Sequence, residues 1–300
     1  MFRFALFFAA AAACAEVREF PGGKELPHEK YIRVVSEADS PIQQVYIKTK
    51  DGLYVSAAMR RPKGPGPFPV LIHFHGAPGG RGIEQLTGWA RGDHGSPVFE
   101  RFLKEGYLVV VADYRGGQNF SRLADAPDPG RITYADDAVA VVDYVRALPF
   151  ADAGRIHVYG VSLGGDVVMH LISRTKVRAA VLGAPAPFGF LGARAGSPGP
   201  DRFKDLKIDE ERTARNIAPI QTPVLILVGT KDGLIALDRP LHDALDKAGK
   251  KVRMEIYENG YHDFVIGPQG HKGRSEPLLD ITLTALENTL RFLKDPDRYN

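Results

Sequence analysis

The sequence predicts an α/β protein in which a mostly parallel central sheet carries helices on both faces and a small cap insertion. Short apolar runs of strand length alternate with helical stretches from Pro69 onward, which is typical of this class. One junction, residues 156–172, combines an apolar strand, a Gly-x-Ser-x-Gly turn and a helix. Polar residues follow several other apolar runs. Because ligands bind beyond the carboxyl ends of parallel strands, these observations place the chemistry at one edge of the sheet.

The composition is that of an ordinary globular protein. The chain has 300 residues, of which 44% are hydrophobic and 25% charged, so it is long enough for one substantial domain. The formal net charge of +3 is mild, and no basic run with interleaved aromatic residues is present. We therefore expect no nucleic-acid partner.

The N-terminal residues differ in character from the rest. Arg3 precedes an apolar run over residues 4–13, and Ala13-Cys14-Ala15 forms a small-x-small cleavage site. The run is well short of the roughly 20 residues that span a bilayer, so we expect a signal peptide over residues 1–15 and no stable membrane insertion. Export would be to the periplasm or the medium. In the alternative, residues 11–14 are a lipoprotein processing box and the protein is anchored at Cys14, the only cysteine.

The remaining chain is expected to form an N-terminal extension over residues 16–40 and a single catalytic domain over residues 41–300. Alternating apolar residues between Ile42 and Met59, with an Asp-Gly turn signal, predict an antiparallel hairpin at one sheet edge. The continuous apolar run of residues 69–74 predicts a strand that is covered on both faces. A glycine-rich loop, residues 75–80, follows it directly.

The middle of the chain continues the alternation. A loop is expected over residues 81–95, then a helix that opens with Ser96-Pro97 and closes at Gly106, and a strand over residues 107–113. A helix over residues 134–148 is expected to be capped by Thr133, with Asp136 and Asp137 near its positive end. The strand and helix that flank Ser162 come next.

The last third adds further strands and one irregular stretch. Strands are predicted over residues 177–182, 223–229 and 252–257, and helices over residues 239–248 and 275–293. Residues 184–221 lack strand periodicity, and begin with proline and aromatic residues before they become charged. This stretch is expected either to be a small lid over an acyl pocket or, in its charged part, to be a solvated surface excursion.

Three residues with the chemistry of a nucleophile, a base and an acid each follow a predicted strand. Ser162 lies in the tight glycine turn, Asp232 after the strand of residues 223–229, and His262 after that of residues 252–257. The order Ser, Asp, His is that of a nucleophile elbow and its partners in this architecture. His271 is the alternative base, and Asp263 and Asp238 are the alternative acids.

The loop after residues 69–74 supplies a second element of the expected chemistry. Its glycines allow the backbone to approach a ligand, so the amide groups of Ala77 and Leu163 are expected to form an oxyanion hole. His73 and His75 are two residues apart, but no third metal ligand follows at a suitable spacing. We therefore expect no metal and no organic cofactor, and a structural role for His75 in its loop.

Three aromatic residues are candidates for a substrate pocket. They are Trp89 in the loop of residues 81–95, Tyr114 after the strand of residues 107–113, and Phe188 in the possible lid. For Trp89 the sequence does not separate contact with an acyl group from packing.

The ordered motifs PVLIHFHGAPGG, ADYRGG, GVSLGGD, LVGTKDG and GYHDF, spread over Pro69 to Phe264, carry a family resemblance. The chain resembles the α/β-hydrolase superfamily, and within it the catalytic domain of the prolyl oligopeptidase-like (S9) serine hydrolases and dienelactone hydrolase-like esterases. The resemblance implies the triad Ser162, Asp232 and His262. It also implies the oxyanion donors Ala77 and Leu163. Such peptidases usually have a large N-terminal propeller before these motifs, where this sequence has a short leader and the predicted hairpin. Dienelactone hydrolases have cysteine at the position of Ser162.

These observations predict an exported serine carboxylesterase that acts on a small-molecule or polymer-borne ester. A peptidase or amidase with the same triad is the alternative, because pocket shape sets the leaving-group preference. A binding protein on a disabled hydrolase fold would lack a member of the triad, and none is missing. The natural substrate and the oligomeric state are left open by the sequence.

Overall fold

The structure is a computed structural model. It describes residues 32–35, 41–51, 54–77, 79–91, 97–115, 131–197, 201–262, 264–266 and 277–298. The predicted signal peptide, Cys14 and most of the predicted extension lie outside these residues. Within them, no helix combines the length and apolar character needed to cross a bilayer.

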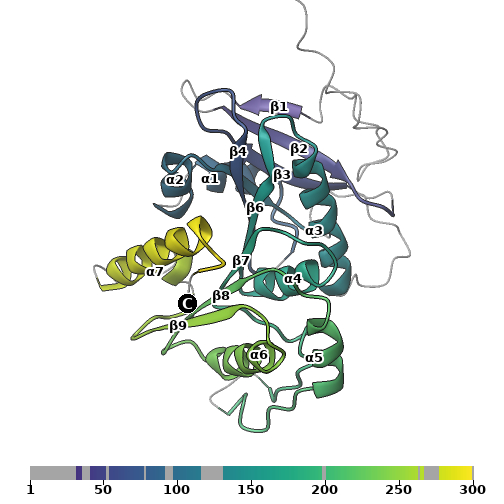
Figure 1. Cartoon of the computed structure of the whole chain (residues 1–300), viewed down its shortest axis with the longest axis vertical. Helices are drawn as coiled ribbons and strands as arrows, with labels where there is room; N and C mark the ends of the chain where they lie inside the picture. The colour runs from purple at the N-terminus through teal and green to yellow at the C-terminus, as the bar shows by residue number, and fades with distance from the viewer. Residues whose placement is uncertain are drawn as a thin grey trace, which may run out of the picture.

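The described residues form one nine-stranded sheet with the order β1-β2-β3-β5-β4-β6-β7-β8-β9 (Figure 1). Six neighbouring strands are parallel, namely β5, β4, β6, β7, β8 and β9. Strands β1, β2 and β3 extend one edge of the sheet and are antiparallel to their neighbours. The predicted mostly parallel sheet is thus confirmed. The strands are β1 Ile32–Val35, β2 Ile42–Lys48, β3 Tyr54–Arg60, β4 Phe68–Phe74, β5 Leu108–Ala112, β6 Ala151–Val161, β7 Ala179–Gly183, β8 Val224–Gly229 and β9 Val252–Tyr257.

Helices cover both faces of the sheet, as predicted. Helices α1, α2 and α7 pack on one face, and α3, α4 and α6 pack on the other (Figure 1). Successive side chains of a strand point to opposite faces, so Ile72 of β4 contributes to one apolar core and Leu71 to the other. The helices are α1 Ile83–Arg91, α2 Pro97–Lys104, α3 Arg131–Arg146, α4 Leu163–Ile172, α5 Glu210–Ile217, α6 Ile235–Lys247 and α7 Pro277–Lys294.

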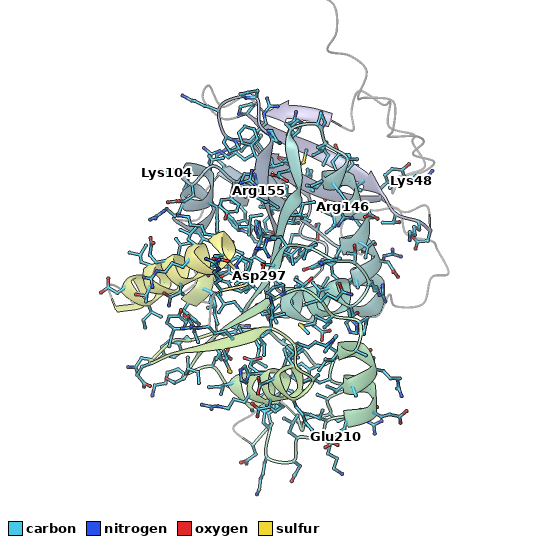
Figure 2. The ribbon with its side chains drawn as sticks, viewed as in Figure 1. Lys48, Lys104, Arg146, Arg155, Glu210 and Asp297 are labelled. Carbon is cyan, nitrogen blue, oxygen red and sulfur yellow. The ribbon has the colours of Figure 1, made fainter. Side chains whose placement is uncertain are left out.

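The N-terminal edge of the sheet matches the predicted hairpin and extends it. β2 and β3 pair antiparallel, with Ile42 opposite Arg60 and Lys48 opposite Tyr54. β1 pairs with β2, so part of the predicted extension is a strand of the sheet. Charged side chains such as Lys48, Lys104 and Glu210 lie at the periphery of the molecule (Figure 2).

Four elements differ from the sequence prediction. Strand β6 begins at Ala151, five residues before its predicted start. The expected loop over residues 81–95 contains helix α1, because Ile83, Leu86 and Ala90 recur at helical spacing and bury one face. Helix α3 begins at Arg131, so Thr133 lies inside the helix and is not its cap. Helix α6 begins at Ile235, four residues before the predicted start.

Described residues of the segment 184–221, among them Phe190, Leu191 and Ile217, pack in the apolar core that α4 and α6 also line. A bridge between Arg194 and Lys207 closes its irregular part, and Asp209 caps helix α5 by accepting a hydrogen bond from the amide of Arg212. The aromatic rings of Phe188 and Phe203 stack, with centroids 6.3 Å apart. A role for this segment as a lid stays a prediction.

Candidate active site

Ser162 lies at the sharp turn between β6 and α4 and has a strained backbone. Its φ of 55° and ψ of −117° are uncommon for a residue with a side chain. The turn is possible because its glycines leave no room for side chains. A Cβ on Gly160 would lie 2.3 Å from the carbonyl oxygen of Gly164, and a Cβ on Gly164 would lie 2.0 Å from that of Phe74. This crowding fixes the serine side chain beyond the end of β6.

The structure brings Ser162, His262 and Asp232 into one hydrogen-bonded line. His262 Nε2 lies 2.9 Å from Ser162 Oγ, and His262 Nδ1 lies 2.8 Å from Asp232 Oδ2. The three residues come from three loops, each after a parallel strand, as the sequence predicted. With Nδ1–H donating to the carboxylate, Nε2 is left as the acceptor for the serine hydroxyl.

The loops that carry the acid and the base are packed tightly against each other. A Cβ on Gly229, at the end of β8, would lie 2.1 Å from the carbonyl oxygen of Gly260. The amide of Lys231 also donates to that carbonyl, at 2.9 Å. Asp232 is 5% exposed, and its Oδ1 accepts a hydrogen bond of 3.0 Å from the amide of Leu234. The carboxylate is therefore held in one orientation, with Oδ2 toward the imidazole.

Of the alternative acids and the alternative base, only Asp238 lies among the described residues. Asp238, on helix α6, is fully buried and forms no hydrogen bond within that part of the chain, so it does not orient His262. Asp263 and His271 lie outside the described residues.

The glycine-rich loop after β4 lies beside the serine. A Cβ on Gly76 would lie 3.2 Å from Cβ and 3.7 Å from Oγ of Ser162, so the Gly76–Ala77 peptide borders the nucleophile. Leu163 is the first residue of helix α4, where amide groups have no partner within the helix and the helix dipole is positive. Both predicted oxyanion donors are thus next to Ser162.

Behind this loop lies a buried pair, His75 and Asp113. His75 Nε2 is 3.0 Å from Asp113 Oδ1, and the side chains are 2% and 0% exposed. His75 Nδ1 lies 2.7 Å from the carbonyl oxygen of Gly76. Burial opposes the charge of Asp113, but hydrogen bonds from His75 and from the amides of Gly82 and Tyr114 hold the pKa of that carboxyl below its usual value. The expected structural role of His75 agrees with these contacts.

The neighbouring His73 is a different kind of residue. Its ring packs edge-on against Phe99 and Tyr159. Burial, and then the proximity of His75, lower the pKa of His73 to about 3, so it is neutral at neutral pH. Among the described residues no cluster of His, Cys, Asp and Glu side chains has the arrangement of a metal site.

One known protein family matches most of the chain. The family model described as "Dienelactone hydrolase family" matches residues 55–276. The chain belongs to the dienelactone hydrolase family.

Members of other groups are similar to this dienelactone hydrolase family protein as well. "Uncharacterized peptidase YuxL" of Bacillus subtilis is 25% identical over 79% of this chain and 37% of its own length. "Acylamino-acid-releasing enzyme 2" of rice, Oryza sativa subsp. japonica, is 24% identical over 75% of this chain and 30% of its own length. The chain thus spans about a third of the length of these two relatives.

A solved structure of a shorter protein matches along most of its length. The esterase of the archaeon Pyrobaculum calidifontis superposes with a TM-score of 0.58 at 18% identity, and the match covers 85% of each chain. At this identity the match shows the shared fold.

The three predicted pocket residues have different surroundings in this dienelactone hydrolase family protein. Tyr114 is fully buried, and its hydroxyl donates to the carbonyl oxygen of His75, so it is a core residue and not part of an open pocket. Trp89 lies on helix α1, half-buried, with its ring 5.6 Å from that of His75. Phe188 is half-buried beneath the guanidinium of Arg202, 4.9 Å from its ring centroid.

Two residues that support the site had no role in the sequence prediction. Asp113 receives hydrogen bonds from the amides of Gly80, Gly82 and Tyr114 and so shapes the glycine-rich loop. Arg81 donates to the carbonyl oxygen of Ala77, at 2.6 Å. The sequence did contain a signal for Asp113. It is an acidic residue directly after a predicted buried strand, in the motif ADYRGG, and the glycine-rich loop offers backbone amides for it to accept from.

Proposed function

We propose that this protein is a serine hydrolase that cleaves carboxylic esters through an acyl-enzyme on Ser162. The observation that carries the proposal is the line of hydrogen bonds from Ser162 Oγ through His262 to Asp232. A serine hydroxyl is a weak nucleophile alone, and an adjacent base with its own orienting acid is what activates it.

In the first half of the reaction, Ser162 Oγ attacks the ester carbonyl while His262 Nε2 takes the hydroxyl proton. Asp232 keeps the imidazole in the required tautomer and stabilises its cationic form. The tetrahedral intermediate has an alkoxide oxygen, which the amides of Ala77 and Leu163 stabilise by on the order of a few kcal/mol each. The intermediate collapses, His262 returns the proton to the leaving alcohol, and the acyl group remains on Ser162.

In the second half, water replaces the alcohol. His262 takes a proton from the water, the hydroxide attacks the acyl carbonyl, and a second tetrahedral intermediate forms. Its collapse releases the carboxylic acid and returns the proton to Ser162. The side chain of His262 is 44% exposed, so water reaches the base without a further conformational change.

Peptide or amide hydrolysis is the second candidate, favoured by the names of the two relatives, one a peptidase and the other an acylamino-acid-releasing enzyme. The same residues serve this reaction, with His262 protonating an amine instead of an alcohol. Those relatives are about three times longer than the matched region, so their whole-protein selectivity does not transfer. Parallel assays on short acyl esters and on peptide amides of the same acyl group distinguish the two candidates.

The test of the proposal is Ser162→Ala. We expect turnover of p-nitrophenyl esters to fall by on the order of 10⁴- to 10⁶-fold, because the acyl-enzyme is no longer formed. The matched control is Ser173→Ala, at the far end of α4, where the hydroxyl donates to the carbonyl oxygen of His170. That variant should retain turnover.

A fluorophosphonate probe provides the complementary measurement. It should label Ser162 in the folded protein and leave Ser162→Ala unlabelled. Turnover retained in Ser162→Ala would refute the acyl-enzyme. A folded protein without turnover and without labelling would instead support a binding protein on a hydrolase fold.

We also propose that the protein is exported by its first 15 residues. The support is the order of Arg3, the apolar run and the small-x-small site in the sequence. N-terminal sequencing and mass spectrometry of the protein from a cell fractionation separate cleavage after Ala15 from lipidation at Cys14.

A further inference from the structure

We propose that His75 is an imidazolium cation that holds the Gly76–Ala77 peptide with its N–H toward the nucleophile and makes that N–H a stronger oxyanion donor. In this role His75 is a positioning residue, since it acts on the reacting atoms through the Ala77 amide. The inference rests on the proposed function, which supplies the oxyanion.

Backbone amides surround the carboxylate of Asp113. Its Oδ1 accepts from the amides of Gly80 and Tyr114, at 2.9 and 2.7 Å, and its Oδ2 accepts from the amide of Gly82, at 2.8 Å. A carboxyl group surrounded by N–H donors is an acceptor and is ionised. The fourth contact, from His75 Nε2 at 3.0 Å, therefore requires an N–H on that nitrogen.

The other ring nitrogen of His75 also faces an acceptor. His75 Nδ1 lies 2.7 Å from the carbonyl oxygen of Gly76, and a carbonyl oxygen only accepts. This contact also requires an N–H. A neutral imidazole has one N–H, so a neutral ring would set a lone pair against an acceptor at one of the two positions. Both contacts are satisfied together when the ring carries two protons.

The geometry of the Gly76–Ala77 peptide sets the direction of its N–H. In a trans peptide the carbonyl and the N–H point in opposite directions. The carbonyl of Gly76 points toward His75, so the N–H of Ala77 points away from His75. Gly76 itself lies beside Ser162, because a Cβ on Gly76 would lie 3.2 Å from that of the serine. The imidazole thus fixes the direction of the amide that receives the oxyanion.

Within the ranges that the structure describes, one anion contacts the ring of His75 and one cation binds its loop. Asp113 is the anion in direct contact, and the guanidinium of Arg81 lies over the ring of Trp89 and binds the carbonyl oxygen of Ala77. The ring of Tyr114 packs 4.7 Å from that of His75. His73, two residues earlier, is neutral, and the proximity of His75 contributes to lowering its pKa.

The consequence is electrostatic as well as steric. Hydrogen bonds in a chain polarise one another in a low-dielectric interior. A cation that donates to the Gly76 carbonyl draws electron density from the peptide and makes the Ala77 N–H more acidic. The charge is in place before the reaction, so it stabilises the oxyanion without reorganisation.

The test uses two substitutions that each keep one of the two contacts. The amide nitrogen of asparagine replaces Nδ1, and that of glutamine replaces Nε2. We expect His75→Gln, which loses the contact to Gly76, to lower kcat for p-nitrophenyl esters about 10- to 100-fold with KM changed less than about 3-fold. His75→Asn keeps a neutral donor to Gly76, so its kcat should fall less than that of His75→Gln.

The matched control is a buried histidine with the same kind of contact away from the site. His157 Nδ1 lies 3.0 Å from the carbonyl oxygen of Val70. His157→Gln should lower the melting temperature and leave kcat within about 2-fold of the parent. If His75→Gln lowers stability to the same extent and leaves kcat unchanged, the positioning role is wrong.

The charge is measured directly by ¹⁵N NMR of histidine-labelled protein, with His75 assigned from its missing signals in His75→Asn. At pH 7 both ring nitrogens should have the chemical shifts of an imidazolium; a neutral ring overturns the inference. Failure of the proposed function would appear separately, as turnover retained in Ser162→Ala.

Discussion

Two fully buried aspartates lie near the candidate active site, Asp113 in contact with His75 and Asp238 close to Asp232. Asp113 follows β5 and supports the glycine-rich loop, while Asp238 lies in the first turns of α6, six residues after Asp232. Both are 0% exposed. Their hydrogen bonding differs completely. Asp113 accepts from His75 and from three backbone amides, whereas neither oxygen of Asp238 has a partner in the described part of the chain.

The two carboxyl groups consequently titrate in opposite directions. Hydrogen bonds outweigh the burial of Asp113, and its pKa is lowered. Burial, together with the nearby charge of Asp232, raises the pKa of Asp238 well above its usual value. Burial alone therefore does not decide whether a carboxyl is charged, since the donors around it do. The donors around Asp113 favour its charged form beside His75, whereas burial of Asp238 near the triad carboxylate favours its protonated form.

The largest expected effect comes from Asp113→Asn. The substitution leaves His75 without its anion and sets an amide NH₂ against N–H donors, so the free energy of unfolding should fall by about 3–5 kcal/mol. Urea denaturation followed by circular dichroism measures the change. A loss below about 1 kcal/mol would mean that the donors around Asp113 contribute little.

The stability of Asp113→Asn relative to the parent should also depend on pH. The pKa of Asp113 is lower in the folded state, so its contribution to stability is present above the unfolded pKa of about 3.9 and is lost as pH falls toward the folded pKa. The stability difference between the parent and Asp113→Asn should therefore shrink below about pH 4. A difference that stays constant down to pH 3 would contradict the ionised carboxylate.

Asp238→Asn is expected to raise the free energy of unfolding, whereas Asp113→Asn lowers it. The raised pKa means that the folded parent keeps a proton that the unfolded chain releases, so the parent loses stability as pH rises above the unfolded pKa of about 3.9. Asparagine does not titrate, and the variant should gain on the order of 1 kcal/mol or more at pH 7, decreasing to zero near pH 3.5.

Thermal unfolding of Asp238→Asn at several pH values, with ester turnover measured in parallel, checks this prediction. Turnover should stay within about 3-fold of the parent, because Asp238 is not hydrogen-bonded to His262. If Asp238→Asn is instead less stable than the parent, by a margin that grows with pH, then Asp238 is ionised and paired.

The smallest effect is expected at an exposed carboxylate, Glu211, which serves as the reference for both buried ones. It pairs with Arg215 one helical turn away in α5, and the two side chains are 86% and 61% exposed. Glu211→Gln should change the free energy of unfolding by less than about 0.5 kcal/mol, and high salt should reduce the change further. A larger effect would indicate that α5 depends on this pair.

The sequence predicted the parts of the fold that are encoded locally. Residues 69–74 and 223–229 are continuous apolar runs of strand length, as expected for strands covered on both faces. The order of Ser162, Asp232 and His262 after such strands was sufficient to bring them to one edge. The parallel arrangement made their meeting a consequence of topology.

The rest depended on contacts between distant segments. Helix α1 was missed because Gly88 within it and the glycines on either side of it in the sequence resemble a loop. Ile83, Leu86 and Ala90 show their helical face only against the sheet. Tyr114 was expected in a pocket, but the acceptor of its hydroxyl is the carbonyl of His75, 39 positions away. The difference between Asp113 and Asp238 likewise has no local signature, since it depends on which amides the fold brings to each.

The backbone of Ser162 has a consequence for anyone who improves this protein in the laboratory. A φ of 55° in a residue with a side chain stores about 1–3 kcal/mol, and glycine adopts such angles at little cost. Selection for heat resistance alone would therefore reward Ser162→Gly, the change that removes the nucleophile. A thermostability campaign on this scaffold needs a turnover criterion in every round, because its most robust descendants are otherwise the inert ones.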